Sequence, residues 1–465
     1  MDVRGKKVLV LGLGDTGLSM TRWLARRGAI VSAADTRAAP PHAAVVRREL
    51  PAVTLECGEF NSASLRAADL IAISPGIDRR TPAIAAAIAH GVPVTGDIEL
   101  FAQALPQAVS RMPKIIAVTG TNGKSTVTQM AGDICIAAGH ATVVAGNIGV
   151  PVLDALTDIE EGRSAPTAFV LELSSFQLET TASLDADAAA MLNASEDHLD
   201  RYDGIDEYAA AKARVFNGRG AQIVNREDAR SVAMAQPGRP VWSFGTGAPG
   251  TERAWGIDQH GGQPTLMRGA NALMPVADLP VAGLHNAANA LAAGALCHAI
   301  GIADAPIVSA LRAYQGLPHR VEKIAVIDGV TYYDDSKGTN VGSTVAALNG
   351  FAQPVVLIAG GEGKGQDFAP LRDPIARHAR AVVLIGRDRE QIARAIEASG
   401  VAVERAATMD EAVQLARAAS RPGDVVLLSP ACASYDMFRS YVHRGEVFVQ
   451  AVQTLLASTT GARAR

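Results

Sequence analysis

A short glycine loop in the first third of the chain has the residues of a phosphate-binding site. The segment Gly120-Thr121-Asn122-Gly123-Lys124-Ser125-Thr126 follows the β-branched run from Lys114 to Thr119 and precedes a stretch with helical spacing from Val127 to Ala138. A strand, a glycine turn and a helix together aim backbone N–H groups and the positive end of the helix at one anion. Lys124 adds a cation for the outer phosphates, and the Ser-Thr pair behind it adds a hydroxyl for Mg²⁺. The loop predicts a site for a nucleoside triphosphate.

Two further side chains follow later strands of the same region. Glu172 lies at the end of a buried run that begins at Ala168, and His198 lies among acidic residues after the run that ends at Leu192. A carboxylate at a strand end beside a phosphate site can hold Mg²⁺, and His198 is a candidate second ligand. The alternative is that both are ordinary polar loop residues. Lys212, on the helical segment 208–216, is by its local sequence only a solvated lysine.

A second glycine motif lies near the start of the chain. Gly12-Leu13-Gly14-Asp15-Thr16-Gly17 follows an apolar strand at 7–11, and a second strand ends in Asp35. This is the dinucleotide pattern G-x-G-x-x-G with a later acid. Asp15 would oppose a diphosphate unless its side chain turned outward, which weakens the NAD interpretation. A turn of this type without any ligand remains an alternative.

The elements that must position these residues are alternating strands and helices. The pattern predicts a three-domain α/β protein: a Rossmann-like domain at 1–112, a central domain at 113–317 and a Rossmann-like domain at 318–465. The central domain combines a P-loop ATPase-like parallel sheet with a small antiparallel sheet or long loops at 230–281. Strands of the third domain are expected at 323–327, 355–359, 382–385 and 425–428.

Polar turns follow the strands of the third domain, at 334–340, 360–365 and 429–436. Loops at the carboxyl ends of parallel strands are where ligands bind, so these turns are candidates for a second substrate.

Asn286 and Asn289 lie three residues apart on one face of an alanine-rich helix. They could contact a purine edge or merely cap and solvate the helix start.

Composition narrows the class of protein. The 465 residues include 43 Lys plus Arg and 47 Asp plus Glu, which gives a net charge of −4. The chain therefore lacks the overall excess of basic residues that is typical of nucleic-acid-binding proteins. Four scattered cysteines have no spacing typical of zinc or of a disulfide framework. The sequence predicts a cytoplasmic protein, since no signal peptide and no membrane span are recognised.

Taken together, the motifs resemble the Mur ligase superfamily, and within it the family that adds D-glutamate to UDP-N-acetylmuramoyl-L-alanine in peptidoglycan synthesis. The glycine loop is shorter than the usual P-loop, and the likeness extends over the whole chain. The motifs that carry it are Gly12-Leu13-Gly14, residues 120–126, Gly146-Asn147-Ile148-Gly149, residues 172–178, Glu196-Asp197-His198, residues 283–286, His319-Arg320, Asp335-Ser336-Lys337 and residues 429–434.

The resemblance implies an ATP-dependent ligase that activates a carboxylate as an acyl phosphate. It implies ATP contacts from Gly120, Thr121, Asn122, Gly123, Lys124, Ser125, Thr126, Asn286, Asn289, Arg320 and Asp335. It implies catalytic roles for Lys124, His198 and Lys212, and the use of two Mg²⁺ ions held by Ser125, Glu172, His198 and Lys212, the last as a CO₂-derived carbamate.

The resemblance also implies where the two other substrates bind. The UDP-linked sugar-peptide would contact Gly14, Thr16, Asp35, Thr36, Arg37, Ser74, Gly76, Asn147 and Gln177. D-glutamate would contact Lys337, Thr339, Lys364, Ser434 and Tyr441. The expected protein is a monomer with no nucleic-acid partner and no membrane insertion. We expect its third domain to swing in on ATP binding about hinges near residues 112 and 317.

Two other functions remain open from the sequence. One is a different amide ligase of the same superfamily, such as a folylpolyglutamate synthetase or a ligase that adds another amino acid. The other is an NAD-dependent oxidoreductase or a nucleotide-binding module built on residues 12–35.

Overall fold

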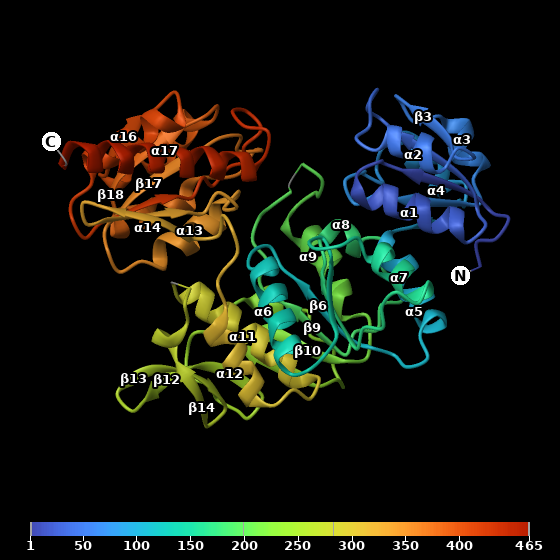
Figure 1. The fold of residues 1–465 in the computed structure, drawn as a ribbon, viewed down its shortest axis with the longest axis horizontal. Coiled ribbons are helices and arrows are strands. Elements are labelled where there is room, and N and C mark those ends of the chain that lie inside the picture. The colour runs from blue at the N-terminus through green and yellow to red at the C-terminus, as the bar shows by residue number, and fades with distance from the viewer. Residues whose placement is uncertain (1, 199, 282, 464–465) are drawn as a thin grey trace.

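Three sheets follow one another along the chain in the computed structural model, which describes residues 2–198, 200–281 and 283–463 (Figure 1). The first is a parallel five-stranded sheet in the order β3-β2-β1-β4-β5. Its strands are β1 (Lys7–Leu11), β2 (Ile30–Asp35), β3 (Thr54–Cys57), β4 (Leu70–Ile73) and β5 (Val94–Thr95). Its helices are α1 (Asp15–Arg26), α2 (Ala43–Glu49), α3 (Ser62–Ala67), α4 (Pro82–Ala89) and α5 (Asp97–Ala108).

The central sheet has nine strands in the order β14-β13-β12-β11-β10-β9-β6-β8-β7. These are β6 (Lys114–Thr119), β7 (Thr142–Gly146), β8 (Ala168–Glu172), β9 (Ala188–Met191), β10 (Ala221–Asn225), β11 (Val241–Phe244), β12 (Ala254–His260), β13 (Gln263–Arg268) and β14 (Asn271–Pro275). Strands β6 to β12 pair in parallel, while β13 and β14 pair antiparallel. The predicted antiparallel strands therefore exist, and they extend the parallel sheet instead of forming a separate one.

The helices of this domain are α6 (Lys124–Ala137), α7 (Val152–Glu160), α8 (Ser175–Leu178), α9 (Ile205–Ala213), α10 (Ala229–Ala233), α11 (Leu284–Ala299) and α12 (Asp304–Ala313). Helix α6 packs against α11 and α12 over a buried apolar cluster that includes Val127, Ile134 and Leu291. This packing fixes α6, whose first turn carries the glycine loop, on one face of the sheet.

The third sheet is mixed, in the order β15-β16-β20-β17-β18-β19, with only β15 antiparallel to its neighbour. Its strands are β15 (Glu322–Ile327), β16 (Val330–Asp334), β17 (Val355–Gly360), β18 (Ala379–Ile385), β19 (Ala402–Arg405) and β20 (Val425–Leu428). Its helices are α13 (Val341–Asn349), α14 (Arg372–His378), α15 (Arg389–Ile396), α16 (Met409–Ala419) and α17 (Tyr441–Arg463). The four predicted strands are present.

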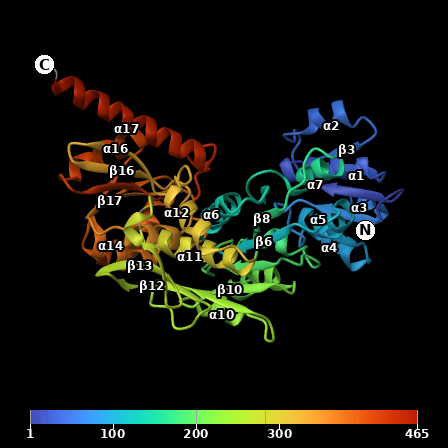
Figure 2. The same cartoon turned by 60° about the horizontal axis from the view of Figure 1, so that its bottom comes forward.

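The three domains are joined by different kinds of contact. One buried apolar cluster runs from the N-terminal sheet into the central domain, where the Phe101 ring lies 5.0 Å from the Phe169 ring. The apolar clusters of the C-terminal domain are separate from it. Figure 2 shows the central domain between the two others. Among the described residues, no helix is both long and apolar enough to cross a membrane.

Candidate active site

The glycine loop connects the end of β6 to the start of α6. Gly123 caps the helix in the left-handed region at φ +82°, and a Cβ placed there would lie 2.5 Å from Oδ1 of Asn289. Gly120 also has positive φ, and its Cβ would lie 2.9 Å from Cβ of Leu192. Both positions therefore require glycine, for conformation and for space. The loop lies at the carboxyl end of β6, between β9 and β8, as predicted.

Lys124 folds back over this loop. Its Nζ donates to the carbonyl oxygens of Gly120 and Thr121 at 2.9 and 2.8 Å. Burial lowers the pKa of this lysine, and Glu172 and Asp197 oppose the shift by attraction. Thr121 is held by its Oγ1, which donates to the Ser195 carbonyl at 3.2 Å, and the Asn122 N–H donates to Asn193. The loop is thus ordered around a cation that faces carbonyl groups.

Glu172 offers a carboxylate oxygen beside the loop. The residue is 1 % exposed at the end of β8, and its Oε1 accepts from Nδ2 of Asn147 at 2.7 Å. Its Oε2 is buried and has no hydrogen-bond partner among the described residues. A buried carboxylate oxygen without a donor is costly unless a cation binds it. This orphaned oxygen, near the hydroxyl-bearing start of α6, fits a hard divalent cation such as Mg²⁺.

Lys212 is not a solvated lysine, so that expectation from its local sequence is wrong. It is 1 % exposed on α9, and its Nζ lies 2.9 Å from the Gly120 carbonyl and 4.6 Å from the Tyr208 ring. Burial, and then the charge of Lys124, hold its pKa well below the ordinary value. Packing of α9 under the loop places this amine beside the phosphate site, which the helix sequence alone does not reveal.

His198 lies in the loop after β9. Its Nε2 is 3.8 Å from Oδ2 of Asp197, and its ring meets the edge of Phe176 at 4.8 Å. Burial is the main cause of its lowered pKa, with repulsion from Lys364 and Lys124 in the same direction. The neutral imidazole is the form that ligates metals, so this environment suits the predicted role.

Residues of the C-terminal domain reach the glycine loop. Nη2 of Arg320 donates to Oγ of Ser125 at 2.7 Å, and Oγ of Ser343 donates to Oδ1 of Asn122, also at 2.7 Å. Asn340 and Asn122 exchange amide hydrogen bonds at 3.1 and 3.3 Å. Ser343 and Asn340 were not among the predicted site residues. Because these contacts are polar, they can be remade without exposing an apolar core.

Of the other nucleotide candidates, the two asparagines and Thr126 adjoin the loop, while Asp335 lies within electrostatic range of Arg320. Nδ2 of Asn289 donates to Oδ1 of Asn286 at 3.3 Å, so the two amides form one pair beside Gly123. Asp335 accepts from Oγ of Ser429 at 2.7 Å, and burial raises the pKa of its carboxyl to about 7. Thr126 is buried in the first turn of α6.

The predicted D-glutamate residues come from three loops of the C-terminal domain and from the first residue of α17. Nζ of Lys337 lies 3.9 Å from the ring centre of Tyr441, and burial, with repulsion from Arg320, lowers its pKa to about 8. Lys364 lies near enough to His198 to influence its charge, and has positive φ. The Thr339 N–H donates to the Lys337 carbonyl, and Ser434 is buried. The structure thus brings Lys337, Thr339 and Tyr441 together.

The first glycine motif builds an anchored turn in the N-terminal domain. Asp35, 2 % exposed, accepts from the Leu13 N–H at 2.7 Å and from the Arg37 guanidinium, which lowers its pKa to about 2. Oγ of Ser74 donates to the Gly12 carbonyl at 3.1 Å. The Asp15 carboxylate is exposed and pairs with Nε2 of His42 at 2.7 Å, but Asp15 also lines the neighbouring cavity between the N-terminal and central domains. Its charge therefore still opposes an anion bound there.

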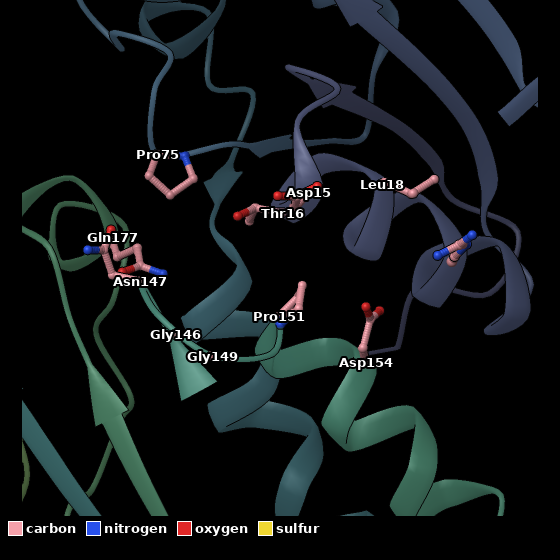
Figure 3. A pocket seen from close by; sticks show the side chains of 11 residues that line it. Asp15, Thr16, Leu18, Pro75, Gly146, Asn147, Gly149, Pro151, Asp154 and Gln177 are labelled. Carbon is pink, nitrogen blue, oxygen red and sulfur yellow. The ribbon is translucent and has the colours of Figure 1, made fainter. Parts of the chain in front are cut away.

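A cavity of about 360 Å³ lies between the N-terminal and central domains. Figure 3 shows Thr16 on one side of it and Asn147 with Gln177 on the other. Gly14 caps α1 beside Thr16, and Pro75, between the predicted residues Ser74 and Gly76, is part of the lining. Asn147 contacts both this cavity and Glu172, so the cavity adjoins the phosphate site. Of the predicted residues for the UDP-linked substrate, only Thr16, Asn147 and Gln177 line this cavity. The others do not: Gly14, Asp35, Thr36, Arg37, Ser74 and Gly76.

Comparison with known proteins identifies the family of this chain. Three family models match: the Mur ligase MurD-like N-terminal domain over residues 6–96, the Mur ligase middle domain over 118–297 and the Mur ligase glutamate ligase domain over 319–432. A UDP-N-acetylmuramoylalanine–D-glutamate ligase of Thiobacillus denitrificans is 57% identical over 98% of both chains, and one of Methylobacillus flagellatus is equally identical over 98% of both. The chain belongs to the D-glutamate-adding Mur ligase family.

The fold of this Mur ligase agrees with that assignment. The UDP-N-acetylmuramate–alanine ligase MurC of Thermotoga maritima matches 97% of the chain, and 99% of its own length, with a TM-score of 0.60 at 18% identity. The predicted family, three-domain α/β fold and ligase class are confirmed. Mur ligases use ATP and Mg²⁺, and they act in peptidoglycan precursor synthesis. The relatives favour this function over the folate ligase and oxidoreductase alternatives.

Proposed function

We propose that this Mur ligase joins D-glutamate to UDP-N-acetylmuramoyl-L-alanine, with ATP converted to ADP and phosphate. The observation that carries the proposal is the meeting of Lys124, Lys212 and the unpartnered Oε2 of Glu172 beneath one glycine loop, next to an interdomain cavity. The Lys124 side chain, the Lys212 amine and an orphaned carboxylate oxygen at one point suit a bound polyphosphate with its metal ions.

The chemistry requires two steps. A carboxylate oxygen of the alanyl group attacks the γ-phosphorus of ATP, the bond to the β-phosphate oxygen breaks, and ADP leaves. The amine nitrogen of D-glutamate then attacks the acyl carbon, the ammonium proton passes to solvent or a base, and inorganic phosphate leaves. Both steps bring anions together, so catalysis rests on cations and donors positioned in advance.

The nucleotide is assigned to the glycine loop and its neighbours. Residues 120–126 would surround the phosphates, with Lys124 leaving its carbonyl partners for the β and γ groups. The paired amides of Asn286 and Asn289 would hold the adenine side. Arg320 and Asp335 would approach from the C-terminal domain, since Arg320 already reaches Oγ of Ser125.

Two magnesium ions fit the oxygen and nitrogen donors present. Ser125 and Glu172 would hold the first, and His198 with Lys212 the second. Bound Mg²⁺ supplies charge neutralisation for the phosphates and the substrate carboxylate. Lys212 is the proposed carbamate site: its lowered pKa favours the neutral amine, which would add to CO₂ with loss of a proton and become an anionic ligand.

The UDP-linked substrate is assigned to the cavity of Figure 3 and the turn beside it. Thr16, Asn147 and Gln177 would contact its sugar and peptide. Gly14, Ser74 and Gly76 would lie near the diphosphate, with the Asp15 carboxylate held at His42. Uracil would lie at Asp35, Thr36 and Arg37, where the Asp35 carboxylate holds the Arg37 guanidinium in place.

D-glutamate carries two carboxylates, which need cations or donors at two points. Lys337 and Lys364 would supply the charges, and Thr339, Ser434 and Tyr441 the hydroxyls.

We assign the domains as 1–112, 113–317 and 318–465 in a cytoplasmic monomer. The C-terminal domain would rotate as a rigid body about residue 317, because its contacts to the loop are polar while the other two domains share an apolar cluster.

The deciding experiment is phosphate release with ATP, UDP-N-acetylmuramoyl-L-alanine and a panel of D- and L-amino acids. We expect release with D-glutamate at least 100-fold faster than with L-glutamate, L-alanine or a diamino acid. Equal rates with several acceptors, or release without the UDP-linked substrate, would refute the assignment.

A further inference from the structure

The side-chain amide of Gln177 is held at both of its ends. Its Oε1 accepts from the backbone N–H and the Oγ of Ser174 at 3.1 and 3.3 Å, within the capping box of α8. Its Nε2 donates to Oδ2 of Asp97 at 3.0 Å. Because a backbone N–H only donates and a carboxylate only accepts, these two partners permit one orientation of the amide.

Asp97 reaches Gln177 from another part of the chain. It is the first residue of α5, which follows the last strand of the N-terminal sheet and lies 80 residues before Gln177. It is 3 % exposed, and its Oδ1 has no partner among the described residues. Burial raises the pKa of this carboxyl to about 6. The first turn of α5 suits a carboxylate, because the N–H groups at a helix start favour negative charge, but one oxygen without a close donor costs stability.

The orientation has a consequence for the cavity. An amide nitrogen carries two hydrogens, and only one of those on Gln177 is donated to Asp97. No acceptor for the second is found in the described part of the chain. Gln177 is also part of the lining of the 360 Å³ cavity between the two domains.

We propose that Asp97 is a positioning residue for the UDP-linked substrate: its carboxylate orients the Gln177 amide so that the second N–H is presented to the cavity. The partner of that N–H is a carbonyl or hydroxyl oxygen of the sugar-peptide. This inference rests on the proposed function, which places the substrate in this cavity. It also means that the Gln177 donor is set only when the N-terminal and central domains are packed as they are here.

Glu99 provides a matched control. It lies two residues further along α5 and spans the same interface, where it accepts from the N–H groups of Ala182 and Ser183 at 2.6 and 2.9 Å and from Oγ of Ser183 at 2.6 Å. Its hydrogen bonds do not include Gln177. A purely structural role for interface carboxylates predicts similar effects at both positions.

The test is initial-rate kinetics with each of the three substrates varied in turn. Asp97→Ala should raise KM for UDP-N-acetylmuramoyl-L-alanine by about five- to tenfold, the loss expected for one misplaced hydrogen bond. Its kcat and its KM for ATP and D-glutamate should stay within about twofold. Asp97→Asn, which keeps an acceptor oxygen, should stay within about threefold throughout, and Glu99→Ala within about twofold.

A double mutant separates this inference from the proposed function. Asp97→Ala combined with Gln177→Ala should be no worse than Gln177→Ala alone; multiplied effects would overturn the inference. A normal KM in Asp97→Ala, with a raised one in Gln177→Ala, would refute the role of Asp97 and leave the substrate site intact. A normal KM in Gln177→Ala would refute the assignment of Gln177 itself. Asp97→Ala could have a much lower melting temperature than Glu99→Ala. In that case Asp97→Leu replaces it in the test, because leucine fills the volume of the side chain without providing an acceptor.

Discussion

The guanidinium of Arg320 donates a 2.7 Å hydrogen bond to Oγ of Ser125, a residue that precedes it by 195 positions. The bond joins the C-terminal domain to the first turn of α6, where Ser125 is also a proposed Mg²⁺ ligand. In the proposed mechanism the same guanidinium would shift from the hydroxyl to the adjacent phosphates. Arg320 would then link domain position to the state of the nucleotide site.

Replacing Arg320 tests this link. Arg320→Ala should lower kcat for phosphate release by at least about 100-fold, since an arginine on a transferring phosphoryl group is worth that much or more. Arg312→Ala is the control, because Arg312 pairs with Asp278 on an exposed surface and should keep its rate within about twofold. An equal loss in both variants would point to a general defect and contradict the role.

The close packing around Gly123 in the glycine loop predicts that a side chain at this position impairs ATP binding. Gly123→Ala and Gly139→Ala both place a side chain at positive φ, at the two ends of α6, so each should lose about 1 to 2 kcal/mol of unfolding free energy. Only at Gly123 would the new Cβ meet Asn289, while at Gly139 nothing lies within 4 Å. We expect KM for ATP to rise at least about tenfold in Gly123→Ala alone. An unchanged KM there would show that the loop tolerates a side chain.

Lys337 predicts a dependence of D-glutamate binding on pH. Its pKa, lowered to about 8 by burial and then by Arg320, means that its charge is present below pH 8 and is lost as the pH rises through that value. KM for D-glutamate should therefore rise between pH 7.5 and 9. Lys337→Arg should remove much of this rise, because arginine stays protonated. The amine of D-glutamate titrates with both enzymes, so the difference between them isolates the lysine; identical profiles would contradict the assignment.

Lys212 predicts a requirement for CO₂. Burial lowers the pKa of its amine and so favours the neutral form that reacts with CO₂. Enzyme prepared without bicarbonate should therefore regain activity when bicarbonate is added. Lys212→Ala should lose at least about 100-fold in kcat, and acetate or another short carboxylate should restore part of it. A Lys212→Ala enzyme with normal activity, unaffected by bicarbonate or acetate, would exclude the carbamate.

The sequence predicted those parts of the fold and site that depend on neighbouring residues. The glycine loop, the strand that ends in Glu172 and the four strands of the C-terminal domain are local patterns of apolar runs and turn residues. Strands β16 and β19 were not predicted. Ala402–Arg405 is short and has only one large apolar residue, Val403.

What the sequence could not predict depends on contacts between distant residues. Lys212 is buried against Gly120, which lies 92 residues earlier in the chain. The hydrogen bond between Asp97 and Gln177 joins residues that are 80 positions apart. In each case the local pattern, a polar residue on a helix, is the same as for a solvated side chain. Only the folded structure distinguishes a buried functional side chain from a solvated one. Lys212 and Gln177 were identified by family resemblance, and Asp97 was missed.

The most direct test of the central claim is phosphate release from ATP by Lys124→Ala beside Lys114→Ala, with UDP-N-acetylmuramoyl-L-alanine and D-glutamate present. Lys114 begins the strand that leads to the loop, and it forms an exposed ion pair with Asp187. We predict that Lys124→Ala loses at least about 1,000-fold in kcat while Lys114→Ala stays within about twofold. Wild-type rates in Lys124→Ala, or no ATP consumption by the unmodified enzyme with magnesium and both substrates, would contradict it.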